Sequence, residues 1–373
     1  MTAQQWPWPA GAATGIGSLP GTDIAEAQKM VLGELPELPH LAELPARGPG
    51  ADLVGRGAAL LVDLPVELYA ARWRVAARPG RDLRRARDLH ERDLDQLAEQ
   101  AAGYRGPLKV QAAGPWTLAA QLDLPAGGRL LRDPGAVREL AASLAEGLRA
   151  YAAQVAARVP GASVLLQLDE PSLPAVLAGR VPTESGLGTL RPVPAGPAAE
   201  LLRTVIAAAG VPVIVHCCAP DPPLDLIRAA GAGAVAVDLD AVDRPGATER
   251  LDVLGEALDA GLGLLAGAAA TTPGVGPSRS GSPTPPPRPA APGAGAPAGP
   301  AGGSPAGRAP DPRELADRVR RLWRRLGLTA ERLPSQVVVT PACGLAGAAP
   351  GWARDALAAC RAAGRELWEA PEP

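Results

Sequence analysis

The sequence contains no phenylalanine, and aromatic residues make up only 3% of its 373 residues. Hydrophobic residues nevertheless reach 47%, so the core must be built mainly from aliphatic side chains. A chain of this length can bury such a core without disulfides or structural metals. We therefore expect one large α/β domain or two smaller ones, with helices that pack closely through their many alanines.

Long apolar runs and a strong net charge are also missing. No uninterrupted apolar stretch approaches the roughly 18 residues of a membrane span, and the formal net charge is only −2. We therefore expect neither a membrane nor a nucleic-acid partner. Residues 1–15 have neither the basic nor the apolar region of a secretory leader. This predicts a cytoplasmic protein whose four cysteines are reduced or metal-bound.

Short apolar runs alternate with helical patterns along most of the chain, which is typical of repeated βα units and a parallel sheet. The runs that we interpret as strands are residues 13–17, 58–62, 108–112, 164–168, 213–216, 235–239, 262–266 and 337–340. Eight parallel strands that alternate with helices predict a single-domain (β/α)8 TIM barrel. In such a barrel the functional residues lie on the loops that follow the strands.

Two helices are well marked. Asp133 as N-cap and Pro134 in the first turn begin a helix whose apolar residues recur every three or four positions as far as Val155. Residues 315–326 repeat this spacing. The arginines expected mainly on the exposed face of that second helix, as a solvated surface, are Arg320, Arg321, Arg324 and Arg325.

A segment rich in Pro, Gly, Ala and Ser interrupts the series before the last strand. Between Pro273 and Pro310 it has no acidic residue and no apolar side chain larger than valine. Such a segment cannot bury enough surface to become ordered, so we predict a disordered insertion over residues 273–310. Residues 1–272 and 311–373 then form the first part of the barrel and its last helix–strand–helix.

Metal-binding residue types follow two of the predicted strands. His216 and Cys218 form an H-x-C pair at the end of one strand, and Cys343 follows the last strand. Residues two apart on a strand point to the same side, and an imidazole with thiolates suits zinc. Cys217 and Cys360 are better interpreted as core residues, because free cysteine is often buried.

Carboxylates follow other strands. Asp169 and Glu170 point to opposite sides of their strand, so only one can enter a pocket, and we favour Asp169. A helix N-cap is an equally good interpretation of this pair. Ser18 lies in a Gly-rich turn that could bind a carboxylate with backbone N–H groups. Glu43 and Asp52 lie in a long loop that could fold over the same end of the barrel.

These motifs together resemble the catalytic barrel of cobalamin-independent methionine synthase, in the wider group that also holds uroporphyrinogen decarboxylase and zinc thiol methyltransferases. The matching motifs, in chain order, are residues 17–20, 114–117, 167–171, 216–218 and 343–345. The resemblance implies zinc held by His216, Cys218 and Cys343. It also implies an amino-acid substrate held by Ser18 and Asp169, with a contribution from a loop glutamate that looks like Glu43, ahead of Asp52.

The sequence departs from that family in three ways. The family's fourth zinc ligand is a glutamate after the sixth strand, and the best match here is Asp238, a competent but shorter ligand. The family's proton-donating histidine has no counterpart, since the other histidines are His40 and His90. The family's folate-binding half has no counterpart either, so the methyl donor could be methyltetrahydrofolate or a methyl-corrinoid protein.

The favoured hypothesis is a zinc-dependent methyltransferase that transfers a methyl group to the thiol of homocysteine to give methionine. One alternative is a metal-free decarboxylase of the uroporphyrinogen type, which would not need a histidine and two cysteines at strand ends. Another is a zinc-binding barrel without catalytic activity. Metal content and a methyl-transfer assay with several donors distinguish the three hypotheses.

We predict that deletion of residues 278–307 leaves folding and metal content intact, because a segment without apolar bulk contributes little to stability. Circular dichroism, thermal melting and elemental analysis of the full-length and deleted chains test this. A fall in melting temperature of more than a few degrees would contradict it, since the segment would then have to pack on the domain.

Overall fold

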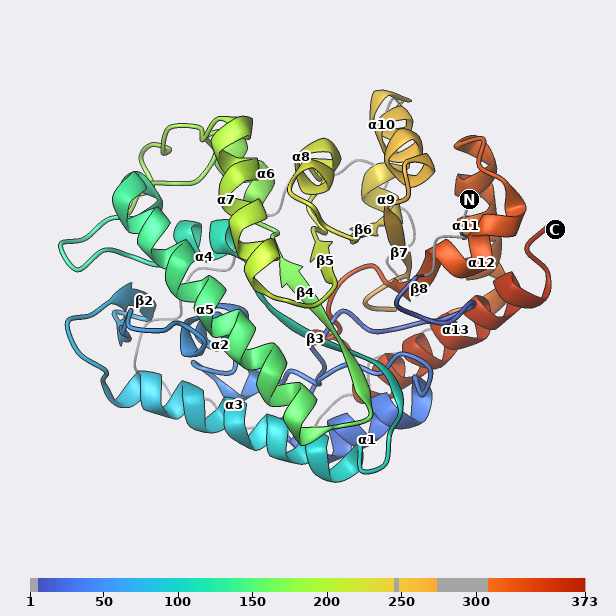
Figure 1. The fold of residues 1–373 in the computed structure, drawn as a ribbon, viewed down its shortest axis with the longest axis horizontal. Helices are drawn as coiled ribbons and strands as arrows, with labels where there is room; N and C mark the ends of the chain where they lie inside the picture. Colours follow the sequence, from blue (N-terminus) through green and yellow to red (C-terminus); the bar gives the residue numbers. More distant parts are fainter. Residues whose placement is uncertain (1–5, 245–247, 274–307, 373) are drawn as a thin grey trace.

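The computed structural model describes residues 6–244, 248–273 and 308–372. Its centre is a curled parallel sheet of six strands in sequential order, surrounded by helices (Figure 1). The strands of this sheet are β3 (Gly106–Ala113), β4 (Ala162–Asp169), β5 (Val213–His216), β6 (Ala234–Asp238), β7 (Gly263–Ala269) and β8 (Val337–Pro341). A separate antiparallel hairpin consists of β1 (Val66–Tyr69) and β2 (Arg72–Val75).

Helices lie outside the sheet and connect its strands. In chain order they are α1 (Ile24–Glu34), α2 (Leu53–Ala59), α3 (Arg81–Gln100), α4 (Pro115–Gln121), α5 (Pro134–Arg158), α6 (Leu173–Leu177), α7 (Ala195–Ala208), α8 (Leu224–Ala229), α9 (Leu239–Val242), α10 (Thr248–Asp259), α11 (Pro312–Arg325), α12 (Leu333–Gln336) and α13 (Pro350–Glu369). Short 3-10 turns occupy Pro45–Arg47, Leu130–Arg132 and Ala330–Arg332.

Six of the eight predicted strands are confirmed, because their apolar, often β-branched runs are buried on both faces as a parallel sheet requires. The prediction of a strand at 58–62 is wrong. Ala58 and Ala59 end α2, and residues 60–62 follow it, since the Asp52 side chain accepts from Gly55 N and caps that helix. Residues 13–17 form no strand beyond a single parallel bridge from Ala13 to Val339.

The two outer strands of the sheet are connected through irregular segments. Ala13 bridges to β8, Ser18 bridges to Glu43, and His40 bridges to Lys109 of β3. Backbone hydrogen bonds support each step, including Leu19 N to Glu43 O at 2.8 Å and Leu41 N to Lys109 O at 3.0 Å. Residues 40–43 therefore occupy the place next to β3 that the sequence analysis assigned to residues 58–62.

The core has two parts that follow the alternation of side chains along the strands. A large apolar cluster lies between the sheet and the helices. A smaller one lies on the opposite face of the strands and includes Leu165, Ile214, Leu265 and Val338. Trp8 belongs to this inner cluster and donates from Nε1 to Ser335 O. On β3 and β4 the inner face changes toward the carboxyl ends from apolar to polar residues.

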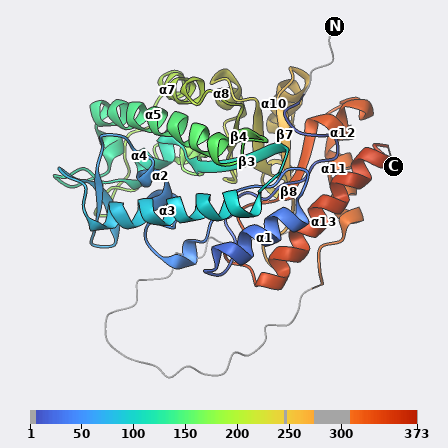
Figure 2. The same ribbon diagram turned by 60° about the horizontal axis from the view of Figure 1, so that its bottom comes forward.

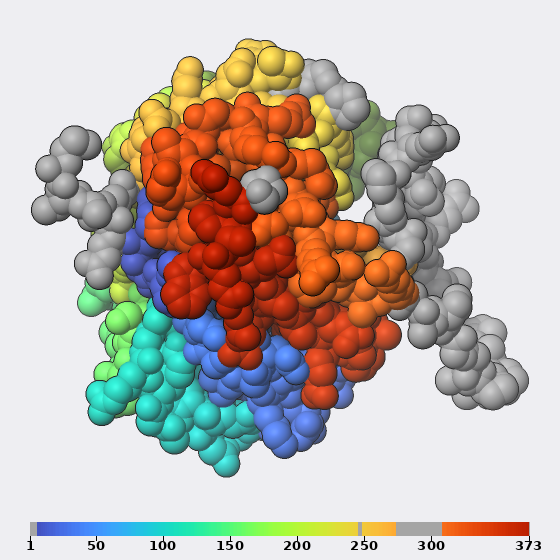
Figure 3. Space-filling view, turned by 90° about the vertical axis from the view of Figure 1, so that its right-hand side faces the viewer, coloured from blue at the N-terminus to red at the C-terminus, as the bar shows by residue number. Residues whose placement is uncertain are grey.

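The outer helices pack against one another in sequence. Figure 2 shows α3, α1 and α13 side by side, in agreement with the contacts of α1 to both neighbours. In Figure 3 the C-terminal segment (red) lies between the orange region of α11 and the blue N-terminal region. The predicted helix after Asp133 is confirmed as α5, with Asp133 accepting from Gly135 N and Ala136 N.

Helix α11 is also confirmed, but the expectation for Arg320 is wrong. Arg320 is buried, with 5% of its surface exposed, because α13 packs over that side of α11. Its guanidinium pairs with Glu366 at 3.0 Å and Asp317 at 2.9 Å. The other three arginines are exposed as predicted. Cys360 is buried on α13, as expected of a core residue.

In the part of the chain that the structure describes, none of the helices combines the length and apolarity needed to cross a bilayer. The predicted insertion at 273–310 falls almost wholly on residues 274–307, which lie outside the described residues.

Glu170 connects the end of β4 to the first turn of α4. Its carboxylate accepts from Trp116 N at 2.9 Å, from Thr117 N at 2.7 Å and from the Thr117 hydroxyl at 2.7 Å. Burial raises the pKa of Glu170 to about 7, against the lowering effect of these hydrogen bonds. Glu170 is therefore the structural member of the Asp–Glu pair, which leaves Asp169 to the inner face.

We predict that Glu170→Ala lowers the free energy of unfolding by about 2 kcal/mol, because it leaves two buried backbone N–H groups without an acceptor. Urea unfolding at neutral pH measures the change. Glu184→Ala, at an exposed position, serves as the control. An equal loss in both variants would show that the hydrogen bonds between Glu170 and the first turn of α4 do not stabilise the fold.

Candidate functional site

A cavity of about 180 Å³ lies at the carboxyl ends of the strands. Six of the eight candidate site residues from the sequence line it together: Ser18, Glu43, Asp169, His216, Cys218 and Cys343. The parallel register explains part of this convergence, because Asp169 lies opposite His216 at the ends of β4 and β5. The remaining wall is mostly apolar, and its small volume suits a molecule of amino-acid size.

The ligand-type atoms of His216, Cys218 and Cys343 all lie within 4.8 Å of one another. The two sulfur atoms are 3.2 Å apart, although the cysteines are separated by 125 residues in sequence. Strand β5 ends at His216 and presents Cys218 two residues later, while Cys343 follows β8. The predicted grouping of these three residues is what the fold produces, and Cys217 is buried in the core beside them.

Gly344 allows this side of the cavity to close. A Cβ atom at Gly344 would lie 2.0 Å from the Ser18 Oγ atom, so any larger residue would displace the serine. Leu345 N also donates to Ser18 O at 2.7 Å. Ser18 is thereby held against the loop that carries Cys343.

His216 is oriented by Asp169. Nδ1 of the ring donates to Asp169 Oδ1 at 2.8 Å, whereas Nε2 is buried without a hydrogen-bond partner among the described residues. Burial lowers the pKa of His216, but the Asp169 hydrogen bond and the Cys343 sulfur outweigh it and raise the pKa to about 9. A carboxylate on one ring nitrogen and an unpartnered second nitrogen is the arrangement found behind metal-bound histidines.

The two thiols influence each other strongly. The hydrogen bond between the two sulfur atoms lowers the pKa of Cys343 and raises the pKa of Cys218, because two thiolates this close would repel each other. A cation between the sulfur atoms would remove that repulsion. One unpartnered imidazole nitrogen and two adjacent sulfurs are the donor set that zinc prefers, so the residues present fit this metal.

Asp238 lies at the end of β6 but outside the group of His216, Cys218 and Cys343. Its carboxylate accepts from Asp240 N at 2.9 Å and caps α9. Burial raises the pKa of Asp238. Its assignment as a fourth metal ligand stays a prediction.

Glu43 enters the cavity from the irregular segment beside β3, and its partner is a residue that the sequence analysis missed. Arg56 of α2 donates from Nε to Glu43 Oε1 at 3.0 Å and from Nη1 to Asp93 at 2.6 Å. Burial raises the pKa of Glu43, with Arg56 opposing and Asp169 adding to that shift. Asp52 caps α2 and does not line the cavity.

Two further residues were missed, Lys109 and Gln167, on the inner faces of β3 and β4. Lys109 is fully buried, and its Nζ donates to Gln167 Oε1 at 2.8 Å. Gln167 Nε2 in turn donates to Asp169 Oδ1 at 2.7 Å. The available signal was a lysine inside a run predicted to be a buried strand, where charged residues are rare unless they are paired.

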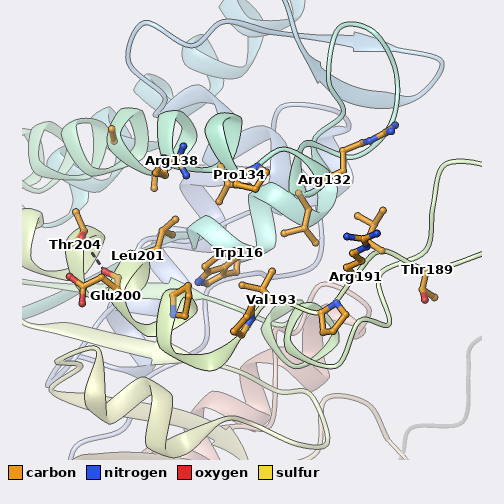
Figure 4. Close-up of a pocket in the computed structure, with 18 residues that line it drawn as sticks. Trp116, Arg132, Pro134, Arg138, Thr189, Arg191, Val193, Glu200, Leu201 and Thr204 are labelled. Carbon is orange, nitrogen blue, oxygen red and sulfur yellow. Dashed lines mark hydrogen bonds between the residues drawn. The ribbon is translucent and has the colours of Figure 1, made fainter.

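A larger cavity of about 980 Å³ lies on the outer surface (Figure 4), between α5, α7 and residues 189–194. Apolar side chains dominate its lining, with Arg132, Arg138 and Arg191 among the polar exceptions. Cysteine and histidine are absent from its described lining, so the chemistry that the sequence points to lies in the smaller cavity.

Comparisons with known proteins agree with this placement. A family model described as the catalytic domain of cobalamin-independent synthase matches residues 11–278. No curated protein matches. Among solved structures, the chain is similar to a B12-independent methionine synthase from Shewanella sp. W3-18-1, in complex with selenomethionine. That likeness has a TM-score of 0.56 at 12% identity and covers 96% of this chain and 98% of that chain.

A second similarity, to a protein from Pseudomonas aeruginosa assigned as a dihydrodipicolinate synthetase, has a TM-score of only 0.34. It has 13% identity over 69% of this chain and 64% of that chain. The similarity to the Shewanella structure supports the fold. The family match covers well over half of the chain and contains five of the six cavity residues named above, all except Cys343. The chain therefore belongs to the cobalamin-independent synthase family, through its catalytic domain.

Proposed function

We propose that the protein is a zinc-dependent methyltransferase that methylates the thiol of homocysteine to give methionine. The observation that carries this proposal is the convergence of the ligand atoms of His216, Cys218 and Cys343, which all lie within 4.8 Å of one another in a cavity that also holds two carboxylates. The sulfur and nitrogen atoms suit a zinc ion, and the carboxylates suit the ammonium group of an amino acid. Family membership supports the same reaction class.

His216, Cys218 and Cys343 would hold the zinc, which when bound supplies a Lewis acid that favours the thiolate form of the substrate. Three protein ligands leave a position for the substrate sulfur.

The remaining residues would bind and orient the amino acid. Both hydrogen bonds described for the Asp169 carboxylate end on Oδ1, which leaves Oδ2 for the substrate ammonium. Glu43 Oε1 accepts a hydrogen bond from Arg56, so its other oxygen can accept a second hydrogen bond from the ammonium group. The Ser18 hydroxyl would bind the substrate carboxylate. Such positioning fixes the thiolate for in-line attack on the donor methyl, whether the donor is methyltetrahydrofolate or a methyl-corrinoid.

We also propose that the fold is a (β/α)8 barrel in which residues 13–18 and 40–43 take the places of the first two strands. The single bridges at Ala13, Ser18 and His40 support this proposal, because they connect β8 to β3 in the order that a closed barrel requires. The cavity then lies at the end of the barrel where such enzymes carry their active sites.

We predict about one zinc ion per chain, lost in Cys218→Ala and in Cys343→Ala while the fold remains intact. The three ligands lie at strand ends, so the core does not depend on the metal. Elemental analysis of the purified, unsupplemented protein gives the stoichiometry. Cys217→Ala is the matched control, since it removes an adjacent thiol outside the ligand group. Metal-free wild type, or full zinc in both ligand variants, would overturn the assignment.

We further predict that Asp169→Asn weakens homocysteine binding about ten- to a hundredfold, because it removes a charge-assisted hydrogen bond worth about 1.5–3 kcal/mol. Zinc should stay bound, since the asparagine Oδ1 atom can still accept from His216 Nδ1. Calorimetric titration with homocysteine and with a simple thiol that lacks an amino group separates the two roles. An equal loss of affinity for both thiols would show that Asp169 acts only by supporting the metal site.

A further inference from the structure

Lys109 is a fully buried cation beneath the floor of the candidate site. Its side chain lies on the inner face of β3, in register with Leu165 of β4. Nζ donates three hydrogen bonds, to Ile16 O at 3.1 Å, Gln111 Oε1 at 3.3 Å and Gln167 Oε1 at 2.8 Å. All three protons of the ammonium group are therefore used by the protein, and Lys109 does not line the cavity.

Each hydrogen bond leads to a different segment of the candidate substrate site. Ile16 lies two residues before Ser18. Gln167 lies two residues before Asp169 and also donates to its carboxylate from Nε2 at 2.7 Å. The third hydrogen bond, to Gln111, leads toward Glu43 through one further hydrogen bond.

That step runs through Gln111. Its Nε2 atom donates to Leu41 O at 2.6 Å, and Leu41 lies two residues before Glu43. One ammonium group thus holds three segments that are distant in sequence, and each segment presents a cavity residue two positions further along. The three hydrogen bonds of Lys109 meet at a single atom, so they fix the segments relative to one another.

We propose that Lys109 is a positioning residue that sets Ser18, Glu43 and Asp169 in the mutual arrangement needed to bind the amino-acid part of the substrate. The inference rests on the proposed function. Lys109 acts through these residues, since it has no position in the cavity wall.

Charge explains why a lysine occupies this position. Burial lowers the pKa of Lys109 to about 8, and the carboxylates of Asp169 and Glu43 oppose that shift. An apolar side chain would fill the interior without the desolvation cost of a buried cation. It would not orient three acceptors, nor would it fix the Gln167 amide with Oε1 toward Lys109 and Nε2 toward Asp169.

The test uses Lys109→Met, which keeps a long unbranched side chain, one heavy atom shorter than lysine, and removes the charge and all three donors. Methionine is the probe, because it is the product of the proposed reaction and has no thiol. We expect its dissociation constant to rise at least tenfold, while zinc content stays at about one ion per chain. Thr340→Val is the matched control. It also removes a buried polar group of the sheet, but the Thr340 hydroxyl, unlike Lys109, has no hydrogen-bond partner among the described residues. It should change methionine affinity less than about twofold.

A double-mutant comparison with Asp169→Asn distinguishes a positioning role of Lys109 from a general effect of its replacement on the fold. If Lys109 acts partly through Asp169, Lys109→Met should cost clearly less in an Asp169→Asn background than in wild type. Equal costs in both backgrounds would overturn the proposal. Unchanged methionine affinity in Lys109→Met would overturn it as well.

Single-bond variants keep the proposal testable if Lys109→Met fails to fold. Gln167→Met removes the link to Asp169 together with a hydrogen bond from Gln167 Nε2 to Ile16 O at 2.8 Å. Gln111→Met removes the link to residues 41–43. The loss from Gln167→Met should be clearly smaller in the Asp169→Asn background, whereas the loss from Gln111→Met should persist. The reverse pattern, or no loss in either variant, refutes the inference. A wild-type protein that binds zinc but no methionine would overturn the proposed function and this inference with it.

Discussion

The hydrogen bond between Asp169 Oδ1 and His216 Nδ1 joins the two halves of the candidate site. It exists because β4 and β5 pair in parallel with these two residues opposite each other, on the face of the sheet that points inward. A shift of the register by one residue would turn one side chain away from the other. The carboxylate thus orients the imidazole toward the cysteines with one oxygen and leaves the other free. Under the proposed function, metal binding and substrate binding would therefore share one residue.

Buried charge of both signs surrounds this contact. Glu43 pairs with Arg56, and Arg56 also binds Asp93, which takes two further hydrogen bonds from Arg47 at 2.7 and 2.8 Å. The buried ammonium group of Lys109 places a further positive charge near Asp169 and Glu43. Unpaired carboxylates at this depth would take up protons, because burial disfavours the ionised form. Paired with cations, they can remain ionised, which is the state that an ammonium group requires.

The sequence was sufficient for the features that depend on local pattern or on the carboxyl ends of parallel strands. Six strands followed from their short apolar runs, and the three ligand-type residues followed from their positions at strand ends. The prediction for residues 58–62 was wrong because a run of small apolar residues fits a strand and a helix equally well. The Asp52 cap decides for the helix. Residues 40–43 have no strand pattern in the sequence. In the structure they pair with β3 only through an isolated bridge.

Contacts between distant segments could not be predicted in this way. Arg56 appeared as one arginine among many, and only the packing of α2 against α3 places it between Glu43 and Asp93. The partners of Lys109 come from residues 16, 111 and 167. Two of these partners share a face with it through strand register, and the third is a backbone carbonyl in an irregular turn. Sequence alone identifies Lys109 as unusual, but not what it holds.

Under the proposed function, the histidines constrain the choice of methyl donor. His40 and His90 lie outside the cavity, and burial together with neighbouring cations lowers the pKa of each to about 3. Both are therefore neutral near pH 7 and cannot donate a proton there. Methyltetrahydrofolate leaves as an amine that must gain a proton, whereas a methyl-corrinoid leaves as reduced cobalt and needs none. Burial raises the pKa of the Glu43 carboxyl, and the Arg56 guanidinium that pairs with it opposes that shift. Under the proposed function, a folate donor would therefore need a proton source other than His40 and His90, whereas a corrinoid donor would need none.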